Sequence, residues 1–204
     1  MAKLQKTIVN EASYSGVGVH TGNVTKLTFK PAPADTGIRF IRTDIAGAPE
    51  VPALIDYVVE TARGTTLGRD FEGQLVKVHT VEHVLSALFG LGIDNAMIEI
   101  DSDEPPEPED GSVATYVEVL DRAGVLEQRE APARLLKITE AVSIDSFGAH
   151  LTAVPYDGFR ISFTIDYRHP VLGAQFASMD ITPEVFRREI APARTFCFYK
   201  DVKI

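Results

Sequence analysis

Residues 76–91 read Val-Lys-Val-His-Thr-Val-Glu-His-Val-Leu-Ser-Ala-Leu-Phe-Gly-Leu, and the fold we expect is built outward from them. Val76 and Val78 alternate with Lys77, as a strand requires. Apolar residues then recur at helical spacing, at Val81, Val84, Leu85, Leu88 and Leu91. Thr80 is placed to be the N-cap, its hydroxyl meeting a backbone N–H that has no helical partner. The stretch predicts a strand that leads into a buried helix, which ends at Gly92.

Glu82 and His83 fall in the first turn of this predicted helix, at its entrance rather than within its packed face. A carboxylate beside an imidazole can be a general base next to a metal ligand, because the metal lowers the pKa of a bound water to about 7. The plainer interpretation is a capped helix with two solvated polar residues. The dipeptide alone favours the plainer interpretation.

His79 adds a third interpretation. Together with Glu82 and His83 it matches the inverted zinc-peptidase pattern His-x-x-Glu-His. That pattern needs both histidines one turn apart on the same helix, whereas His79 follows the strand and precedes the expected cap. We therefore treat His83 as the metal ligand and His79 as the weaker candidate.

Length and composition are those of a globular protein of 204 residues with 45% hydrophobic content. No apolar run approaches the roughly 20 residues that span a bilayer. The first residues, 1–7, lack the apolar segment of a signal peptide. We expect a cytoplasmic protein without a transmembrane segment.

The single cysteine and the net charge narrow the chemistry further. Cys197 alone excludes an internal disulfide and a thiolate zinc knuckle, so any metal must be held by histidine and carboxylate. Between Phe196 and Phe198, Cys197 is better explained as a small buried hydrophobe than as a nucleophile. A net charge of -9 argues against non-specific binding to nucleic acid, though not against a small phosphorylated molecule.

A short self-similarity suggests how the chain is divided. Residues 27–40 and 151–161 both read strand, proline turn, glycine, strand. We interpret this as a duplicated α+β unit made of a sheet and two helices, with a first domain at 1–129 and a second at 130–204. The first copy has two helices, at 81–91 and 113–123, but the second has none in the equivalent place. The second copy is therefore expected to be incomplete.

Two loops carry further signals. His20 lies between glycines in Ser15–Gly22, which marks either a site or a plain hairpin corner. Residues 101–111, Asp-Ser-Asp-Glu-Pro-Pro-Glu-Pro-Glu-Asp-Gly, are acidic and stiffened by proline, so we expect an extended loop with its charges facing water. Asp110 is the exception, because it precedes the second helix and is placed to turn inward. Further on, Thr182 and Pro183 are expected to begin a helix through Ile190.

Several motifs, taken in order, carry a resemblance. They are Ser15-Gly-Val-Gly-Val-His20-Thr-Gly22, Pro31-Ala-Pro33, Thr80-Val-Glu82-His83, Gly92-Ile-Asp-Asn95, Asp110-Gly-Ser112, Phe163-Thr-Ile-Asp166-Tyr-Arg-His169-Pro170 and Ala193-Arg-Thr195-Phe196. No single motif is specific, but the ordered set resembles the UDP-3-O-acyl-N-acetylglucosamine deacetylases of lipid A biosynthesis. The resemblance covers nearly the whole chain.

That resemblance implies a duplicated α+β fold with the active site between its halves, and a zinc-dependent removal of acetate from the sugar's 2-amino group. By the same resemblance Glu82 is the general base, His83 binds Zn²⁺, and Thr195 donates a hydrogen bond to the developing oxyanion. The positions that match residues near the nucleotide and sugar are Asp166, Tyr167, His169 and Phe196, with His20 at the pocket edge.

The chain also departs from the family. The other zinc ligands of the family come from a His-Lys-x-x-Asp helix, and its general acid from a later histidine, and neither is present. We therefore expect an N-terminal portion of such an enzyme, with little activity alone, because catalytic zinc needs about three protein ligands. The alternative is a non-catalytic homologue that binds a nucleotide sugar or a partner protein. Glu107-Pro108-Glu109 also replaces a more apolar run, and His79 stands in place of a small polar residue.

Overall fold

A five-stranded sheet forms the centre of the first half of the chain. The computed structural model describes residues 3–167 and 169–196. The strands of this sheet run in the order β2-β3-β9-β4-β5, with β4 parallel to β9 and the other neighbours antiparallel. Their bounds are Ala12–Val17 for β2, Val24–Pro31 for β3, Ile38–Arg42 for β4, Glu50–Pro52 for β5 and Ala96–Ile100 for β9.

Two smaller groups of strands accompany this sheet. One is antiparallel and contains β6 (Val58–Glu60), β7 (Thr66–Phe71) and β8 (Gln74–Val78), after a short 3-10 turn, η1, at Ile55–Tyr57. The other pairs β1 (Leu4–Ile8) with β10 (Val125–Pro132). Because Val76 and Val78 lie in β8, the strand expected there is confirmed.

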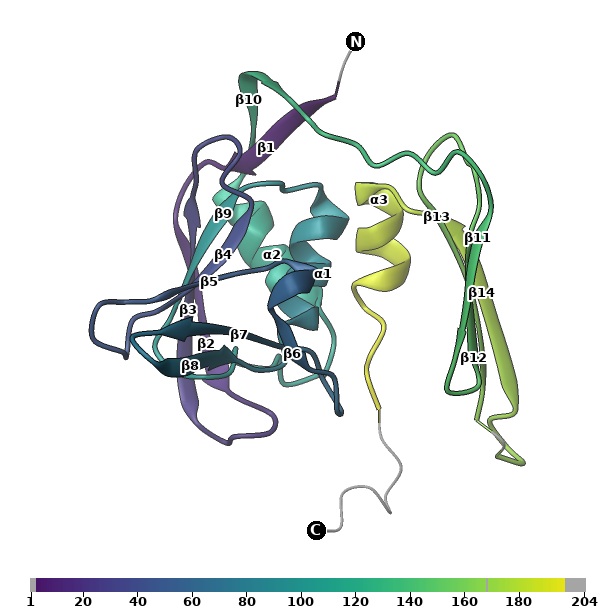
Figure 1. Cartoon of the computed structure of the whole chain (residues 1–204), viewed down its shortest axis with the longest axis horizontal. Helices are drawn as coiled ribbons and strands as arrows, with labels where there is room; N and C mark the ends of the chain where they lie inside the picture. The colour runs from purple at the N-terminus through teal and green to yellow at the C-terminus, as the bar shows by residue number, and fades with distance from the viewer. Residues whose placement is uncertain (1–2, 168, 197–204) are drawn as a thin grey trace.

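Two helices cover one face of the five-stranded sheet (Figure 1). They are α1 (Glu82–Leu91) and α2 (Ala114–Ala123), and both were expected from the apolar spacing. The buried side chains that join them to the sheet include Leu27, Phe29, Phe40, Val84, Leu88, Ile98, Tyr116 and Leu120. Each large apolar side chain buried in this way contributes about 1.5 to 3 kcal/mol. Gly92 ends α1 with a φ of 71°, as a left-handed C-cap does.

Thr80 does not cap α1, and that prediction is wrong. The N-cap position is Val81, which makes no side-chain cap bond. Thr80 has a φ of 51°, and its hydroxyl donates to Oε1 of Glu104 at 2.7 Å. The Thr80 hydroxyl thus bonds to a carboxylate instead of a helix N–H. This bond is the stronger one, because charge-assisted hydrogen bonds are roughly twice as strong as neutral ones.

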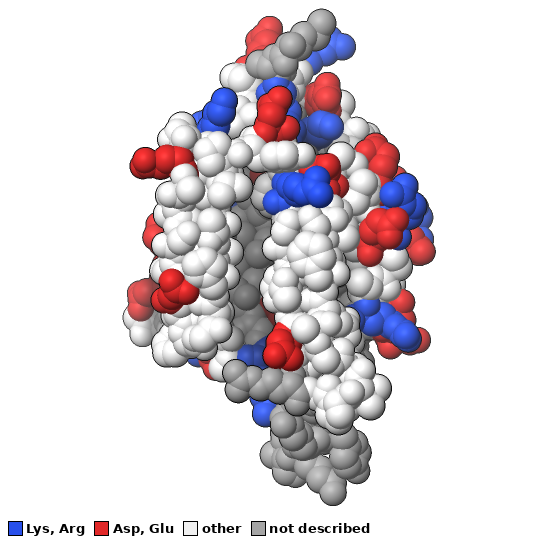
Figure 2. All heavy atoms as spheres, turned by 90° about the vertical axis from the view of Figure 1, so that its right-hand side faces the viewer, with Lys and Arg blue, Asp and Glu red and all other residues white. Residues whose placement is uncertain are grey.

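The second half of the described chain consists mainly of two separate antiparallel ribbons. β11 (Val142–Ser146) pairs with β12 (Ala149–Ala153), and β13 (Arg160–Asp166) pairs with β14 (Ala174–Asp180). Figure 2 shows their outer face as two ridges with few charged side chains and a groove between them. Exposed apolar residues along these ribbons include Val142, Ile144, Leu151, Phe163 and Phe176.

The fold class is α+β, as predicted. The two halves resemble each other in the order of their hairpins along the chain. β2 and β3 form a hairpin, β4 and β5 a second one, and β9 lies between β3 and β4. The ribbons β11-β12 and β13-β14 follow the same order, but no described strand joins β12 to β13. The duplication and the incomplete second copy both stay predictions.

A short helical segment follows the ribbons in the chain. α3 (Pro183–Val185) continues into the π-helical turn η2 (Phe186–Ile190), and Thr182 caps it by accepting the Val185 N–H at 3.2 Å, as expected. The segment lies between α1 and α2 on one side and the ribbons on the other (Figure 1). Within the described ranges, none of the helices has the length and apolar character needed to cross a membrane.

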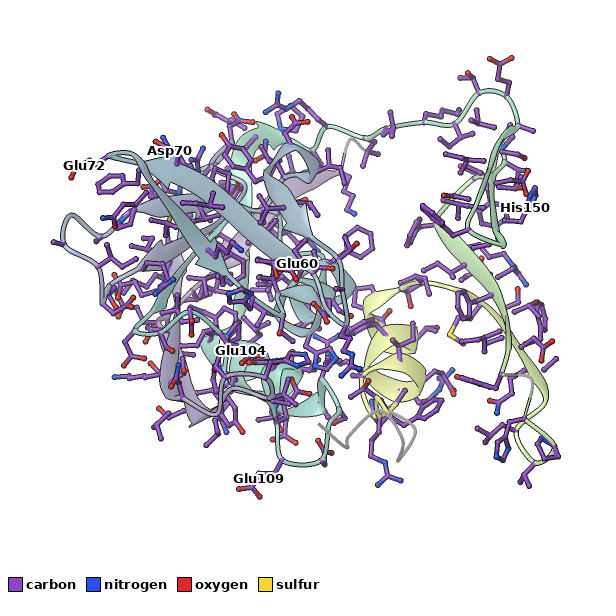
Figure 3. All side chains as sticks on the ribbon, turned by 60° about the horizontal axis from the view of Figure 1, so that its bottom comes forward. Glu60, Asp70, Glu72, Glu104, Glu109 and His150 are labelled. Carbon is purple, nitrogen blue, oxygen red and sulfur yellow. The ribbon has the colours of Figure 1, made fainter. Side chains whose placement is uncertain are left out.

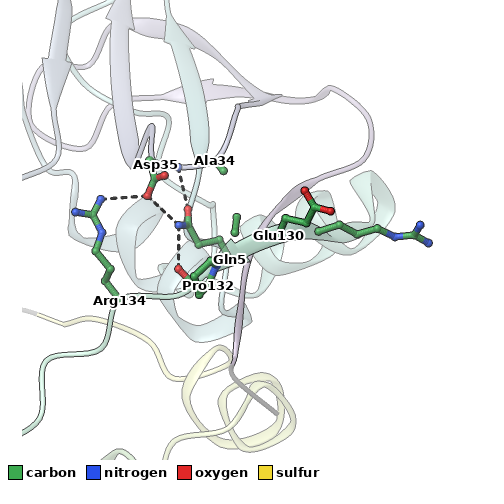
Figure 4. Close-up of a pocket in the computed structure, with 8 residues that line it drawn as sticks. Gln5, Ala34, Asp35, Glu130, Pro132 and Arg134 are labelled. Carbon is green, nitrogen blue, oxygen red and sulfur yellow. Dashed lines mark hydrogen bonds and ion pairs between the residues drawn. The ribbon is translucent and has the colours of Figure 1, made fainter.

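The connector leaves the first half beside β1. Gln5 donates to Asp35 at 2.9 Å and to the Pro132 carbonyl at 3.3 Å, and Arg134 donates to Asp35 at 3.1 Å (Figure 4). β10 runs to Pro132, past the expected boundary at 129/130, and remains paired with β1. The exact division into domains stays a prediction.

Candidate active site

Glu82 is the first residue of α1, and its carboxylate is fixed by the chain opposite. Oε2 accepts the backbone N–H of Thr65 at 2.9 Å. A Cβ built on Gly64 would lie 3.2 Å from Oε1, so the loop passes close to the carboxylate. Glu82 is therefore a half-buried carboxylate held in one orientation.

His83, the next residue, pairs with a glutamate from another element. Its Nδ1 lies 2.8 Å from both carboxylate oxygens of Glu107. The side chains are 21% and 15% exposed, so the pair is largely withdrawn from water. The hydrogen bond to Glu107 raises the pKa of His83 above 6.5, burial opposes the rise, and the charges of Glu107 and Glu82 add to it. The pairing leaves Nε2 as the ring nitrogen that can coordinate a metal.

The acidic tract at residues 101–111 only partly faces water, so that expectation is corrected. Glu104 is fully buried, and Pro105, Pro106 and Pro108 are buried too. Figure 3 shows Glu104 inside the first half and Glu109 pointing away from it. Asp110 is exposed and accepts from the Ser112 hydroxyl at 2.9 Å, so it does not turn inward. Charge alone indicated solvent, whereas donors from distant segments decide which carboxylates are buried.

Glu104 holds the loop that carries His20. It accepts the backbone N–H of His20 at 3.1 Å, the backbone N–H of Thr21 at 2.8 Å, and the hydroxyls of Thr21 and Thr80 at 2.9 and 2.7 Å. Burial raises the pKa of this carboxyl, but the hydrogen bonds outweigh it and hold the pKa below 4.5. A Cβ on Gly18 would lie 2.5 Å from Oε2, so only glycine fits there. His20 itself is exposed.

Thr195 lies against the same loop that carries Glu107. Its backbone N–H donates to the Gly111 carbonyl at 3.0 Å, and the neighbouring Arg194 forms a bridge with Ser112. Thr195 is exposed. The fold therefore brings the end of the described chain to the loop that contacts His83. Whether the Thr195 hydroxyl meets an oxyanion stays a prediction.

The four residues expected near the nucleotide and sugar come from two segments. Tyr167 and Phe196 contact each other, with ring centroids 5.1 Å apart. Asp166 ends β13, and Tyr167 follows it, with its N–H donating to Gly173 at 3.2 Å. His169 lies in the turn toward β14, where its Nδ1 accepts the Val171 N–H at 3.2 Å. Their roles toward a substrate stay predictions.

His79 does not share a helix with His83. α1 begins at Glu82, and His79 lies in the connection after β8. Its Nδ1 lies 3.1 Å from the Thr66 hydroxyl, and its backbone N–H donates to Asp103 at 2.8 Å. The inverted zinc-peptidase interpretation is therefore wrong, because its two histidines must lie one turn apart on one helix.

The metal-binding role expected for His83 stays a prediction. Among residues 3–167 and 169–196, no group of three or more His, Cys, Asp and Glu side chains could hold a metal ion. Catalytic zinc takes about three protein ligands. His83 fits as one of them, because Glu107 lies 2.8 Å from its Nδ1 and leaves Nε2 as the nitrogen for a metal.

The site places a carboxylate and an imidazole side by side at the entrance of a helix in an α+β fold. The chain belongs to the family described as LpxC: UDP-3-O-acyl N-acetylglycosamine deacetylase, whose sequence model matches residues 5–204. The family expected from the motifs is thereby confirmed.

Curated relatives agree with this membership. A protein of Chlorobaculum tepidum named bifunctional enzyme LpxC/FabZ is 47% identical over 201 residues, 98% of this chain and 42% of the relative. The UDP-3-O-acyl-N-acetylglucosamine deacetylase of Myxococcus xanthus is 47% identical over 199 residues, 98% of this chain and 62% of the relative. That of Pseudomonas entomophila is 44% identical over 201 residues, 98% of this chain and 64% of the relative. The chain thus spans between 42% and 64% of the length of these three relatives.

Proposed function

We propose that the protein acts as a zinc-dependent deacetylase, which removes acetate from UDP-3-O-acyl-N-acetylglucosamine in lipid A biosynthesis. One observation carries the proposal: Glu82 and His83 stand side by side at the entrance of α1, each oriented by a partner from another segment. The names of the relatives supply the substrate and reaction. A cytoplasmic location belongs to the same proposal.

His83 would be one ligand of the zinc ion through Nε2. When bound, zinc polarises a carbonyl and lowers the pKa of a water to about 7. Glu82, held by the Thr65 N–H, accepts the proton of the attacking water. The Thr195 hydroxyl donates a hydrogen bond to the oxyanion that develops on the acetamide. The departing amine takes up a proton from an acid, a group that we do not assign to a described residue.

The remaining expected residues would bind the rest of the substrate. Tyr167 and Phe196, already in contact, offer aromatic surface for a base or sugar. Asp166 and His169 lie on either side of Tyr167 in the sequence and can hydrogen-bond to hydroxyl groups. His20 would close the pocket from the loop that Glu104 holds.

The 204 residues alone are expected to release little acetate. The described part supplies His83 but no group of three or more metal ligands. Catalytic zinc takes about three protein ligands, so His83 alone would not hold it in place. The full activity is therefore proposed for the longer protein that such relatives represent.

The proposal is tested with a longer protein that contains this chain and the segments found in its relatives. Acetate release from the UDP sugar should stop after zinc is removed with a chelator and return when zinc is added. His83→Gln should lose at least 100-fold in activity together with bound zinc. His150, exposed on the β11-β12 ribbon, provides the control (Figure 3), and His150→Gln should leave both unchanged.

Two results would contradict the proposal. One is undiminished acetate release from metal-free protein. The other is a His83→Gln variant that keeps both its zinc and its activity. Tight binding of the UDP sugar by zinc-loaded protein without any hydrolysis would instead support the non-catalytic homologue.

A further inference from the structure

We infer that Glu107 is a positioning residue for His83, whose carboxylate accepts the Nδ1–H and keeps the ring in the tautomer and orientation that leave Nε2 free to coordinate. This inference rests on the proposed zinc site and adds a residue to it. The carboxylate comes from the acidic loop, at a position where sequence patterning predicted a solvated charge.

The loop holds Glu107 rigidly. The Glu107 N–H donates to the Val17 carbonyl at 3.0 Å, which ties the loop to the end of β2. The hydroxyl of buried Tyr116 donates to the Pro106 carbonyl, directly before Glu107. Pro108 follows directly, and its carbonyl accepts the Gly111 N–H at 2.9 Å. The two prolines and these hydrogen bonds restrict the backbone on both sides of Glu107, so its carboxylate is positioned without a ligand.

The contact with His83 explains how the carboxylate of Glu107 can be buried. Both carboxylate oxygens of Glu107 lie 2.8 Å from Nδ1, and Oε1, which is buried, has no other polar partner among the described residues. Burying a carboxylate costs free energy unless a donor lies beside it, and the Nδ1–H of His83 supplies that donor. A metal on Nε2 would leave this contact in place. Histidine ligands commonly donate their other N–H to a carboxylate, which fixes the tautomer.

The test measures the His83 tautomer directly in the chain of 204 residues, without metal. Nitrogen-15 NMR of the histidine ring, recorded at alkaline pH where the ring is neutral, distinguishes Nδ1–H from Nε2–H. Wild type should be mainly the Nδ1–H form. Glu107→Leu removes the acceptor and should reverse the preference, whereas Glu107→Gln keeps an uncharged acceptor and should fall between them.

Glu109→Gln is the matched control, because it removes one charge from the same loop at an exposed side chain. It should keep the wild-type tautomer. A second readout is a zinc titration of the longer protein, followed at the His83 ring, in which Glu107→Leu should need about 10- to 100-fold more zinc than wild type.

The outcomes separate the two proposals. If Glu107→Leu keeps the Nδ1–H form, or if Glu109→Gln loses it equally, the role of Glu107 is overturned. The same holds if zinc shifts the ring resonances of wild type and Glu107→Leu at equal concentrations. If the tautomer changes as predicted but zinc never perturbs His83 in the longer protein, the pairing stands and the proposed zinc site fails.

Discussion

Glu104 illustrates at the scale of a single residue how a buried carboxylate shapes the surroundings of a site. It gathers donors from the His20 loop and from Thr80, which precedes α1. Thr80, which makes this contact, has a left-handed φ of 51°. The carboxylate therefore couples the loop expected at the pocket edge to the start of the helix that carries Glu82.

Replacing Glu104 should expose this coupling as a pH-dependent loss of stability. Because its folded pKa lies below 4.5, the carboxylate contributes stability that is present above pH 4.5 and is lost as the pH falls through the folded pKa. Glu104→Gln should lower the free energy of unfolding by about 2 kcal/mol or more at pH 7. The deficit should shrink in urea unfolding below about pH 4.5. A deficit that is constant with pH would show that the charge is irrelevant.

Gly64 offers a residue-scale test of how Glu82 is oriented. Its Cβ would lie 3.2 Å from Oε1 of Glu82, so the carboxylate must move by a few tenths of an ångström in Gly64→Ala. Stability should change by less than about 1.5 kcal/mol, because the obstacle is the end of a flexible side chain. Acetate release by the longer protein should nevertheless fall several-fold, since small misplacements near reacting groups are costly. Unchanged activity would mean that the position of Glu82 is not critical.

At the scale of elements, α1 was predictable because its periodicity is local, while its cap was not. Val84, Leu88 and Leu91 are buried as their spacing indicated. Thr80 failed as a cap because its partner, Glu104, lies 24 residues away and cannot be recognised from neighbouring sequence. The same limit hid Glu107, whose partner His83 is also 24 residues distant. Apolar spacing predicts the helix, whereas contacts between distant residues determine the conformation at its N-terminus.

The close packing of η2 on α1 requires a residue without a side chain at position 90. Gly90 faces the ring of Phe186, and a Cβ there would lie 2.3 Å from the nearest ring atom. Gly90→Ala should lower the free energy of unfolding by about 1 to 3 kcal/mol, although alanine is the better helix former.

A double-mutant cycle separates these two effects. With Phe186→Ala in the background, Gly90→Ala should cost nothing and can gain about 1 kcal/mol, since only helix propensity remains. Urea unfolding of the four proteins measures the coupling. Equal costs of Gly90→Ala in both backgrounds would show that the contact does not limit the packing of η2 on α1.

At the scale of the whole molecule, the two halves differ in how their strands are covered. The first half packs α1 and α2 on its sheet, whereas the ribbons expose apolar side chains. Phe163 pairs with Ala177 and Phe176 with Thr164, so the two aromatic rings lie on opposite faces of the β13-β14 ribbon. The short repeat in the sequence indicated this imbalance, but the separation of the strands into two ribbons was not predictable.

The exposed ribbons should bind a hydrophobic dye at neutral pH. Exposed apolar patches of this kind are sites of association. The double variant Phe163→Thr and Phe176→Thr should reduce dye fluorescence severalfold, because threonine keeps the preference for strands. Phe147→Asn, which removes an exposed ring at the β11-β12 turn, is the control and should change it less. Absence of dye binding by the wild-type chain would favour a self-sufficient, non-catalytic protein.

The central claim is that Glu82 is the base of a water-activating site beside His83. The most direct measurement is the rate constant for acetate release by the zinc-loaded longer protein, compared with its Glu82→Gln variant. The account predicts a fall of about 100- to 10,000-fold with zinc content unchanged, because Glu82 moves a proton and does not hold the metal. A Glu82→Gln variant that turns over within a few-fold of wild type would contradict it.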